Sequence, residues 1–145
     1  MCIRDSTKPT RAFFGKKDFQ QLTLIKNFVK DNNFPIEIIS VNTVRELNGL
    51  AMSSRNNRLS ESDRVSAAKL YKTLCSIKDN SDNLSYELIE SHKNKLIQQG
   101  FDVDYLSVCD PNTLKDLENV NSNPMLVAIA ASIGEIRLID NILID

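Results

Sequence analysis

The spacing of apolar residues changes along the chain, and these changes predict the order of helices and strands. A short apolar stretch at residues 11–14 reads as the end of a strand. In residues 19–31 the apolar positions recur every three or four residues, which is typical of an amphipathic helix. Residues 36–41 (IEIISV) are rich in β-branched side chains and lie between turn formers, which predicts a strand. The pattern therefore predicts a βαβ-like unit over residues 11–41.

The pattern of the later residues predicts a second unit. Helical spacing covers residues 61–78, where Ser60 and Asp63 form a capping box, and residues 84–99, where Gly100 ends the helix. The first of these helices is expected to bury Val65, Ala68, Leu70 (or Tyr71) and Leu74. Three β-rich segments follow, at 103–108, 125–131 and 136–142. Two helices with a three-stranded, mainly antiparallel sheet make a compact α+β unit.

Composition narrows the class of protein. A chain of 145 residues with 41% apolar residues can bury the core of one domain or of two small ones. The formal charge of −1 argues against nucleic acid as the main partner, which requires a basic face. The longest apolar run, residues 125–133, is about half of a membrane span and reads as a buried strand. Residues 1–6 lack the apolar region of a signal peptide, and we exclude them from the fold as a scar or assembly artefact.

Cysteine and histidine usage predicts no metal site. The three cysteines have no C-x-x-C spacing, and His92 is the chain's one histidine, so a zinc site has too few clustered ligands. Free, buried thiols in a reducing cytoplasm are the expected state of the cysteines. His92 has no catalytic partner nearby in the sequence, and we expect it to face solvent on its helix.

Two loops carry groups that suit anions. The first lies at the start of the first helix, where Lys17, Asp18 and Gln21 accompany the unpaired amides of a helix N-terminus. The second lies within the run VRELNGLAMSSRNNRLS at residues 44–60. It brings into one loop Gly49, Met52, Ser53, Ser54, Arg55 and Asn56. Backbone amides, hydroxyls and a guanidinium suit a polyphosphate or a developing negative charge, so both loops together indicate nucleotide chemistry.

Three segments resemble the second half of the pantoate–β-alanine ligase (pantothenate synthetase) family: PTRAFFGKKDFQQL, PIEIISVNTVRELNGLAMSSRNNRLS and VAIAASIGEIRLIDNI. The resemblance runs from about Lys8 to Leu143. It implies an α/β fold. Residues 7–42 would be the end of a Rossmann-like domain of the class I aminoacyl-tRNA synthetase kind, and residues 43–145 a small α+β lid domain.

The family's reaction has two steps. ATP, accompanied by Mg²⁺, adenylates pantoate and releases pyrophosphate, and the amine of β-alanine then attacks the pantoyl adenylate and releases AMP. The resemblance also implies a cytoplasmic enzyme that is homodimeric when complete.

The resemblance also assigns roles to residues of this chain. The positions that match the family's ATP contacts are Gly15, Lys16, Lys17, Asp18, Val44, Met52, Ser53, Ser54 and Arg55. Among them, Lys17, Ser53, Ser54 and Arg55 would carry catalysis by stabilising phosphate charge. The MSSR residues match the KMSKS loop of the synthetases. Gln21 matches the glutamine that binds pantoate, where an amide can both donate and accept hydrogen bonds.

The chain departs from the family pattern in three places. Lys16 stands where the family often has glutamate, and Asn42 where it often has proline, which would loosen the hinge between domains. The family's first half carries two histidines in an HxGH-type motif, which this chain does not contain. We therefore expect a C-terminal half with little activity by itself.

Two other readings stay open. A lid-like domain of this composition would also suit a protein that binds a nucleotide or a partner chain without catalysis. A different nucleotidyl-transferring enzyme of the same superfamily is the other reading, and the glutamine that follows KDF argues for the pantoate enzyme against it.

Overall fold

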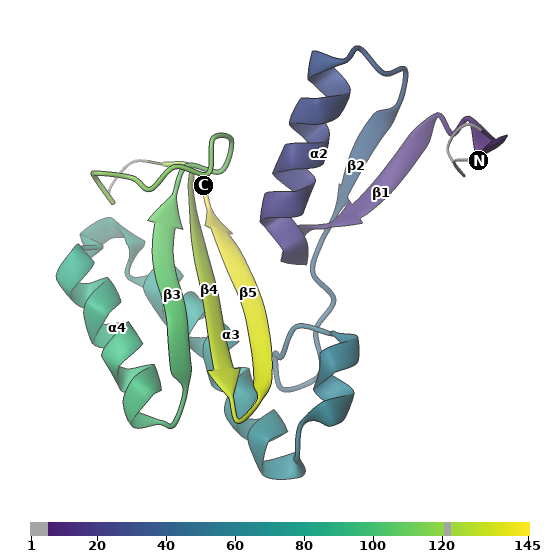
Figure 1. Cartoon of the computed structure of the whole chain (residues 1–145). Helices are drawn as coiled ribbons and strands as arrows, with labels where there is room; N and C mark the ends of the chain where they lie inside the picture. The colour runs from purple at the N-terminus through teal and green to yellow at the C-terminus, as the bar shows by residue number, and fades with distance from the viewer. Residues whose placement is uncertain (1–5, 121–122) are drawn as a thin grey trace. The chain divides into compact units, whose positions relative to one another are not determined.

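The computed structural model of the chain describes residues 6–120 and 123–145 (Figure 1). Residues 1–5, which belong to the segment set aside as an artefact and include Cys2, lie outside the described residues. The chain divides between Thr43 and Val44 into two compact units, which are described in turn. A short parallel sheet belongs to the first unit and a three-stranded antiparallel sheet to the second, so the predicted α/β class is confirmed at that level.

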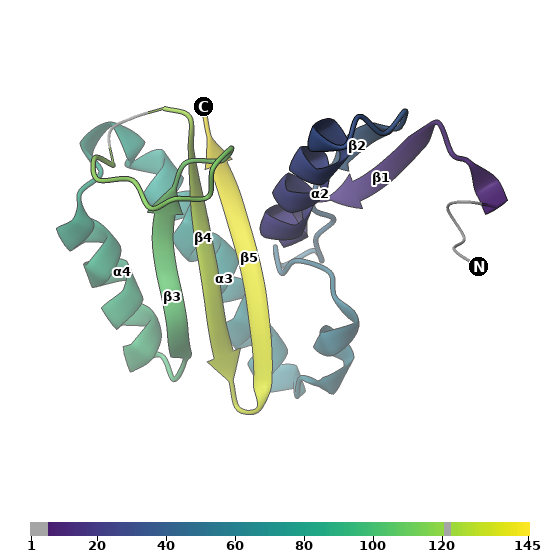
Figure 2. The same cartoon turned by 45° about the horizontal axis from the view of Figure 1, so that its top comes forward.

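The first unit is the predicted strand–helix–strand arrangement. Strands β1 (Arg11–Gly15) and β2 (Glu37–Val41) pair in parallel, and the chain between them forms the 3-10 turn η1 (Lys16–Asp18) and helix α2 (Phe19–Asp31). Parallel strands need such a crossover, and α2 packs on one face of the pair (Figures 1 and 2).

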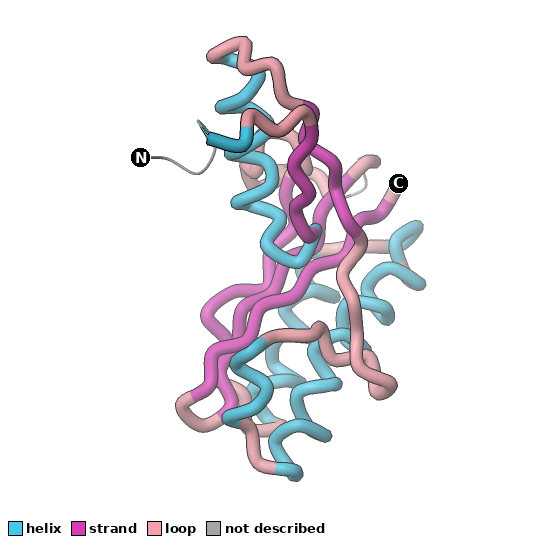
Figure 3. Tube along the Cα trace, turned by 90° about the vertical axis from the view of Figure 1, so that its right-hand side faces the viewer, coloured by secondary structure: helices cyan, strands magenta, loops and turns pink. Residues whose placement is uncertain are grey.

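The second unit is built on one sheet with the strand order β3-β4-β5. The strands are β3 (Asp102–Cys109), β4 (Met125–Ile133) and β5 (Ile136–Ile144), and both pairings are antiparallel, as predicted. Helix α3 (Glu61–Asp79) packs against β4 and β5, and α4 (Tyr86–Gln98) against β3 (Figure 3). The 3-10 turns η2 (Ser54–Arg58) and η3 (Ser81–Asn83) precede these helices.

Local signals explain where the two helices begin and end. Ser60 Oγ accepts a hydrogen bond from the backbone N–H of Asp63 at 3.1 Å, which confirms the predicted cap of α3. Helix α4 begins two residues later than predicted, because Ser85 is its N-cap and accepts from the N–H of Leu88 at 3.2 Å. Gly100 adopts a φ of +91° just after α4, which a residue with a side chain rarely adopts.

Two predictions about which side chains are buried are wrong. Val65 is 68% exposed, because it lies on the opposite side of α3 from Ala67, which faces the core. His92 is only 8% exposed, not solvent-facing. It lies one turn from both Ile89 and Leu96, so it shares their buried face of α4.

Two remaining expectations concern thiols and membranes. Cys75 and Cys109 are free cysteines, as predicted for these two residues. Cys109 is also buried as predicted, whereas Cys75 is only half-buried. Among the residues that the structure describes, no helix combines the length and the apolar character that crossing a membrane requires.

Candidate functional site

The first predicted phosphate-binding segment is the connection from β1 to α2. Gly15 is the last residue of β1 and has an extended backbone, and the following residues form η1, in which no residue is buried. Asp18 occupies the N-cap position of α2, but its side chain makes no capping hydrogen bond. Gln21 is the third residue of α2 and is exposed. The segment therefore presents two lysines and an amide near a helix N-terminus.

The second predicted segment, residues 52–55, is an exposed loop between two buried residues. Ala51 is 3% exposed and Asn56 is 2% exposed, whereas Met52 between them is 55% exposed. Ser53 Oγ accepts a hydrogen bond from the N–H of Arg55 at 3.3 Å and so begins η2. The two ends of the loop, Ala51 and Asn56, are therefore buried, while the loop between them carries the two hydroxyls and the guanidinium.

A tight hairpin brings Val44 beside this loop, although seven residues lie between it and Met52. The N–H of Met52 donates to the carbonyl of Val44 at 2.9 Å, and Arg45 and Ala51 form the next bridge inward. The turn closes where the N–H of Gly49 donates to the carbonyl of Glu46 at 2.9 Å. Val44 and Met52, which the resemblance predicts to contact the nucleotide, are thus joined by a backbone hydrogen bond.

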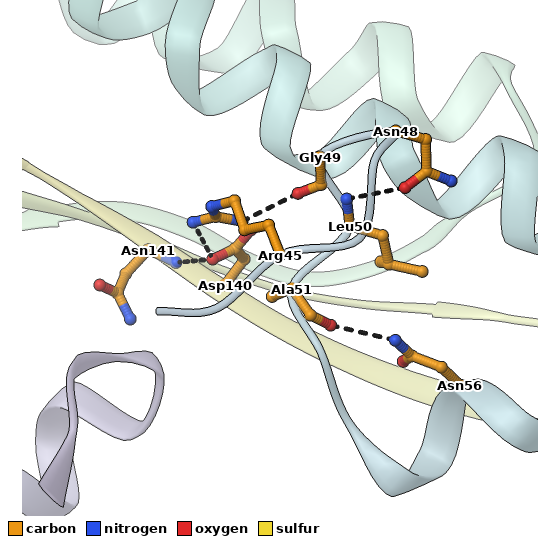
Figure 4. A network of polar contacts seen from close by, with 8 residues as sticks. All are labelled: Arg45, Asn48, Gly49, Leu50, Ala51, Asn56, Asp140 and Asn141. Atoms are coloured by element: carbon orange, nitrogen blue, oxygen red, sulfur yellow. Dashed lines mark hydrogen bonds and ion pairs between the residues drawn. The ribbon is translucent and has the colours of Figure 1, made fainter. Parts of the chain in front are cut away.

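Arg45 fixes this hairpin to the sheet of the second unit (Figure 4). Its guanidinium donates to both carboxylate oxygens of Asp140 in β5, at 2.6 and 3.0 Å, and to the carbonyl of Gly49 at 3.1 Å. It also stacks over the ring of Tyr71 in α3, 3.5 Å from the centroid. Interaction with the Cys75 thiol and then burial raise the pKa of Tyr71, while the charge of Arg45 lowers it. The phenol therefore stays neutral beneath the guanidinium.

Glu46, the next residue, faces a different set of partners. Its Oε1 accepts from Nδ2 of Asn56 at 2.9 Å, and its Oε2 lies 3.5 Å from Nη1 of Arg64 in α3. Arg64 also donates to the backbone carbonyl of Asn56 at 2.9 Å. The loop after Met52 is therefore tied to both the hairpin and α3.

Sequence reasoning assigned no role to most of these anchoring residues. Asp140 is 95 residues from Arg45, so no local spacing reveals the pair. A weak signal exists: Asp140 interrupts the apolar run RLIDNILI, and a lone acid in a buried strand usually has a cationic partner.

The arrangement of residues 44–56 suits the binding of a polyphosphate. Hydroxyl and guanidinium groups are exposed on a backbone that buried contacts hold in place, so binding requires little further ordering. Within residues 6–120 and 123–145, no three His, Cys, Asp or Glu side chains are grouped so as to hold a metal ion.

Comparison with known proteins gives one consistent result. The family model described as pantoate-beta-alanine ligase matches residues 3–143. The pantothenate synthetase of Coprothermobacter proteolyticus is 43% identical over 142 residues, which are 94% of this chain and 50% of that protein. The pantothenate synthetase of Clostridium botulinum is 46% identical over 140 residues, 92% of this chain and 48% of that protein. The chain thus spans about half the length of these relatives.

Solved structures agree with the sequence relatives. The crystal structure of pantothenate synthetase from Thermus thermophilus matches 97% of this chain and 51% of its own chain, with a TM-score of 0.88 and 36% identity. The ligase from Francisella tularensis, solved as a complex with beta-gamma ATP and beta-alanine, matches 97% of this chain and 46% of its own, with a TM-score of 0.69 and 33% identity.

Proposed function

Because the chain belongs to the pantoate–β-alanine ligase family, we propose that it forms the C-terminal half of an enzyme that joins pantoate to β-alanine. ATP would adenylate the pantoate carboxylate and release pyrophosphate, and β-alanine would displace AMP. The observation that carries this proposal is the exposed loop at residues 52–55. It has the family's MSSR sequence, and the residues at its two ends, Ala51 and Asn56, are buried. The break between Thr43 and Val44 supports a division into part of a nucleotide-binding domain, 7–42, and a lid, 43–145.

The proposed roles follow from charge and hydrogen-bonding capacity. Lys17 and Arg55 would stabilise the negative charge that grows on the departing pyrophosphate. Ser53 and Ser54 would donate hydroxyl hydrogen bonds to phosphate oxygens. Gln21 would contact pantoate. The other proposed ATP contacts are Gly15, Lys16, Asp18, Val44 and Met52.

Mg²⁺ fits this site as a companion of the nucleotide. Magnesium keeps several waters and is commonly bound through substrate phosphates, so a cage of protein carboxylates is not required. The acidic side chain in the first segment is Asp18, which is exposed. This chain's own contribution would be to hold the phosphates that bind the ion.

Three further parts of the proposal concern substrates, assembly and location. The Francisella tularensis relative was solved with an ATP derivative and β-alanine, which supports both as ligands here. A homodimer is proposed for the complete enzyme on the family resemblance. A cytoplasmic location is proposed because Cys75 and Cys109 are free thiols.

The test joins residues 7–145 to the first half of the Coprothermobacter proteolyticus enzyme and measures release of pyrophosphate and AMP. We expect turnover that requires ATP, pantoate and β-alanine together. The same chain without that half should show little or no turnover. Nucleotide binding by the joined protein without AMP release would favour a non-catalytic binding domain. AMP formation with another acid in place of pantoate would favour a different nucleotidyl transferase.

Variants of the joined protein test the residue roles. Lys17→Ala and Arg55→Ala should each lower the rate of adenylate formation roughly 10²–10³-fold, the usual scale for removing one charge-stabilising group. Arg58→Ala is the matched control, because Arg58 is also an exposed arginine of η2. Gln21→Ala should raise the KM for pantoate more than that for ATP, with the exposed neighbour Gln20→Ala as control.

A further inference from the structure

We propose that Asn56 is a positioning residue for the phosphate-binding loop at residues 52–55, acting through that loop rather than on a substrate. This inference rests on the function proposed above. Its basis is the way the Asn56 side chain closes the base of the loop, which no local feature of the sequence reveals.

One hydrogen bond joins the two ends of the loop. Nδ2 of Asn56 donates to the backbone carbonyl of Ala51 at 3.1 Å (Figure 4). Four residues lie between these two, and they are the MSSR residues. Inside the loop the N–H of Asn56 donates to the carbonyl of Ser53 at 3.1 Å, and the N–H of Arg55 donates to Ser53 Oγ. Bonds at the base and within the loop together restrict its backbone.

The second hydrogen of the same amide fixes the loop to the preceding hairpin. Nδ2 of Asn56 also donates to Oε1 of Glu46 at 2.9 Å. A charged acceptor makes this the stronger of the two bonds. Arg64 then ties Asn56 to α3 through the Asn56 backbone carbonyl. The base of the loop is therefore attached to a helix of the hydrophobic core.

One polar atom of the Asn56 amide is buried and unsatisfied. Oδ1 of Asn56 is buried and has no hydrogen-bond partner among the described residues, and the residue is 2% exposed. Turning the amide over would place Oδ1 against the Ala51 carbonyl and the Glu46 carboxylate, which are both acceptors, so the orientation is determined. The site thus uses the two donors of Asn56 and leaves its acceptor unpaired, an arrangement that is unfavourable for stability alone.

The consequence is a loop that is exposed yet already ordered. Hydroxyl and guanidinium groups that must meet the phosphates in one geometry benefit from a backbone that is fixed beforehand. Removing the Asn56 donors would leave the chemical groups of the loop in place and loosen their positions. The rate of adenylation should fall even though no group that touches ATP is lost.

The test measures adenylation in the joined protein for Asn56→Ala, for Asn57→Ala as the matched exposed asparagine, and for Arg55→Ala with and without Asn56→Ala. We expect Asn56→Ala to lower kcat at least tenfold and Asn57→Ala to change it less than twofold. With Arg55 already replaced, Asn56→Ala should cost less than threefold more, because Asn56 acts partly through the placement of Arg55. Asn56→Leu, which keeps a similar volume and loses both donors without adding a charge, should be as defective as Asn56→Ala.

Hydrogen exchange of the 145-residue chain gives a readout that does not depend on catalysis. In Asn56→Ala the amides of residues 55 and 56 should exchange at least tenfold faster, while those of residues 70–74 in α3 stay unchanged. If Asn56→Ala does not fold, Asn56→Leu, which removes both donors without adding a buried charge, takes its place in both measurements.

The outcomes separate this inference from the proposed function. If Arg55→Ala lowers adenylation and Asn56→Ala does not, or if their effects multiply in full, the inference is wrong and the proposed function stands. If Arg55→Ala has no effect, the proposed role of the loop fails. In that case only hydrogen exchange tests whether Asn56 restricts the loop. If the exchange rates of the amides of residues 55 and 56 do not change in Asn56→Ala, the inference is wrong.

Discussion

The two segments that we propose to bind ATP differ in how their own units hold them. The first, residues 15–18, is a strand end followed by a 3-10 turn without a buried residue, and its helix begins without a side-chain cap. The second, residues 52–55, lies between two buried residues and on a hairpin that Arg45 attaches to β5. Both segments carry cationic side chains, which are half-buried at Lys16 and Lys17 and exposed at Arg55, but the second segment is preorganised by contacts within its own unit.

The difference follows from where the hydrophobic core lies. The large cluster of buried apolar side chains belongs to the second unit and joins α3, α4 and all three strands of its sheet. In α2 of the first unit, Leu22 and Thr23 are the buried residues, while Phe13, Leu24 and Phe28 of that unit are largely exposed. Buried apolar area is the main source of stability. The loop anchored to the second unit is therefore attached to the more stable of the two units.

Breaking the Arg45–Asp140 pair should produce the largest loss of stability. The Asp140 side chain is 4% exposed, so Arg45→Ala would leave a buried carboxylate without its partner. We expect the free energy of unfolding of the second unit to fall by about 3–5 kcal/mol, measured by urea denaturation. The control is Arg137→Ala, which breaks the exposed pair with Asp104 and should cost about 0–1 kcal/mol. If Arg45→Ala cost no more than about 1 kcal/mol, the range of an exposed pair, the Arg45 anchor would not be a strongly stabilising contact.

Adding a methyl group at Gly49 should produce the next largest effect. Gly49 and Gly100 have similar backbone angles, with φ of +95° and +91°, so alanine strains both alike. A Cβ at Gly49 would lie 2.8 Å from Cδ1 of Tyr71, whereas one at Gly100 would meet nothing within 4 Å. Because Arg45 covers the Tyr71 ring, the ring cannot move away freely, and Gly49→Ala should cost about 1–3 kcal/mol more than Gly100→Ala. Thermal unfolding of both variants measures the difference, and equal costs would mean that the hairpin yields easily.

Hydrogen exchange compares the two units directly. Amides of β1, α2 and β2 should exchange at least tenfold faster than those of α3, because the first unit buries few apolar side chains. A tenfold difference corresponds to about 1.4 kcal/mol in the free energy of local opening. Uniform protection across residues 11–98 would contradict both the proposed domain division and the contrast between the loops.

Local sequence patterns sufficed to predict the elements but not their orientation. Apolar spacing placed α2 at its observed bounds and found the three strands of the second unit, because period and turn residues act within a few positions. The error at Val65 concerned the rotation of a helix about its axis. That rotation depends on which face meets the sheet, and one helix's own sequence specifies it weakly.

The candidate site shows the same limit. Residues that match a motif, such as those of MSSR, are found from the sequence by resemblance. The residues that hold the motif in place are not, because Arg45 reaches Asp140 and Tyr71 through the folded chain. Asn56 is adjacent to the motif, yet its role depends on the Ala51 carbonyl and on Glu46, whose positions follow from the hairpin.

His92, whose burial was not predicted, gives the last and smallest test of the contrast between the units. Burial, and then the charge of Lys95, lower the pKa of His92 in the folded chain below its usual value of about 6.5. As the pH falls through 6.5, the unfolded chain therefore takes up a proton before the folded chain does, and folding stability decreases; above about pH 7.5 it is independent of this group. One histidine changes the free energy by at most about 1.4 kcal/mol per pH unit.

Urea denaturation between about pH 8 and pH 5.5 measures this effect, with His92→Gln as the variant that cannot titrate. We expect the natural chain to lose stability relative to His92→Gln as the pH falls. His92 is the chain's one histidine, so the loss should be confined to the second unit. In hydrogen exchange corrected for intrinsic rates, amides of α4 should lose protection at the acidic end of this range and those of α2 should not. A loss of equal size in α2 would mean that the two units open together. The difference between the two proposed ATP-binding segments would then not reflect separate stabilities.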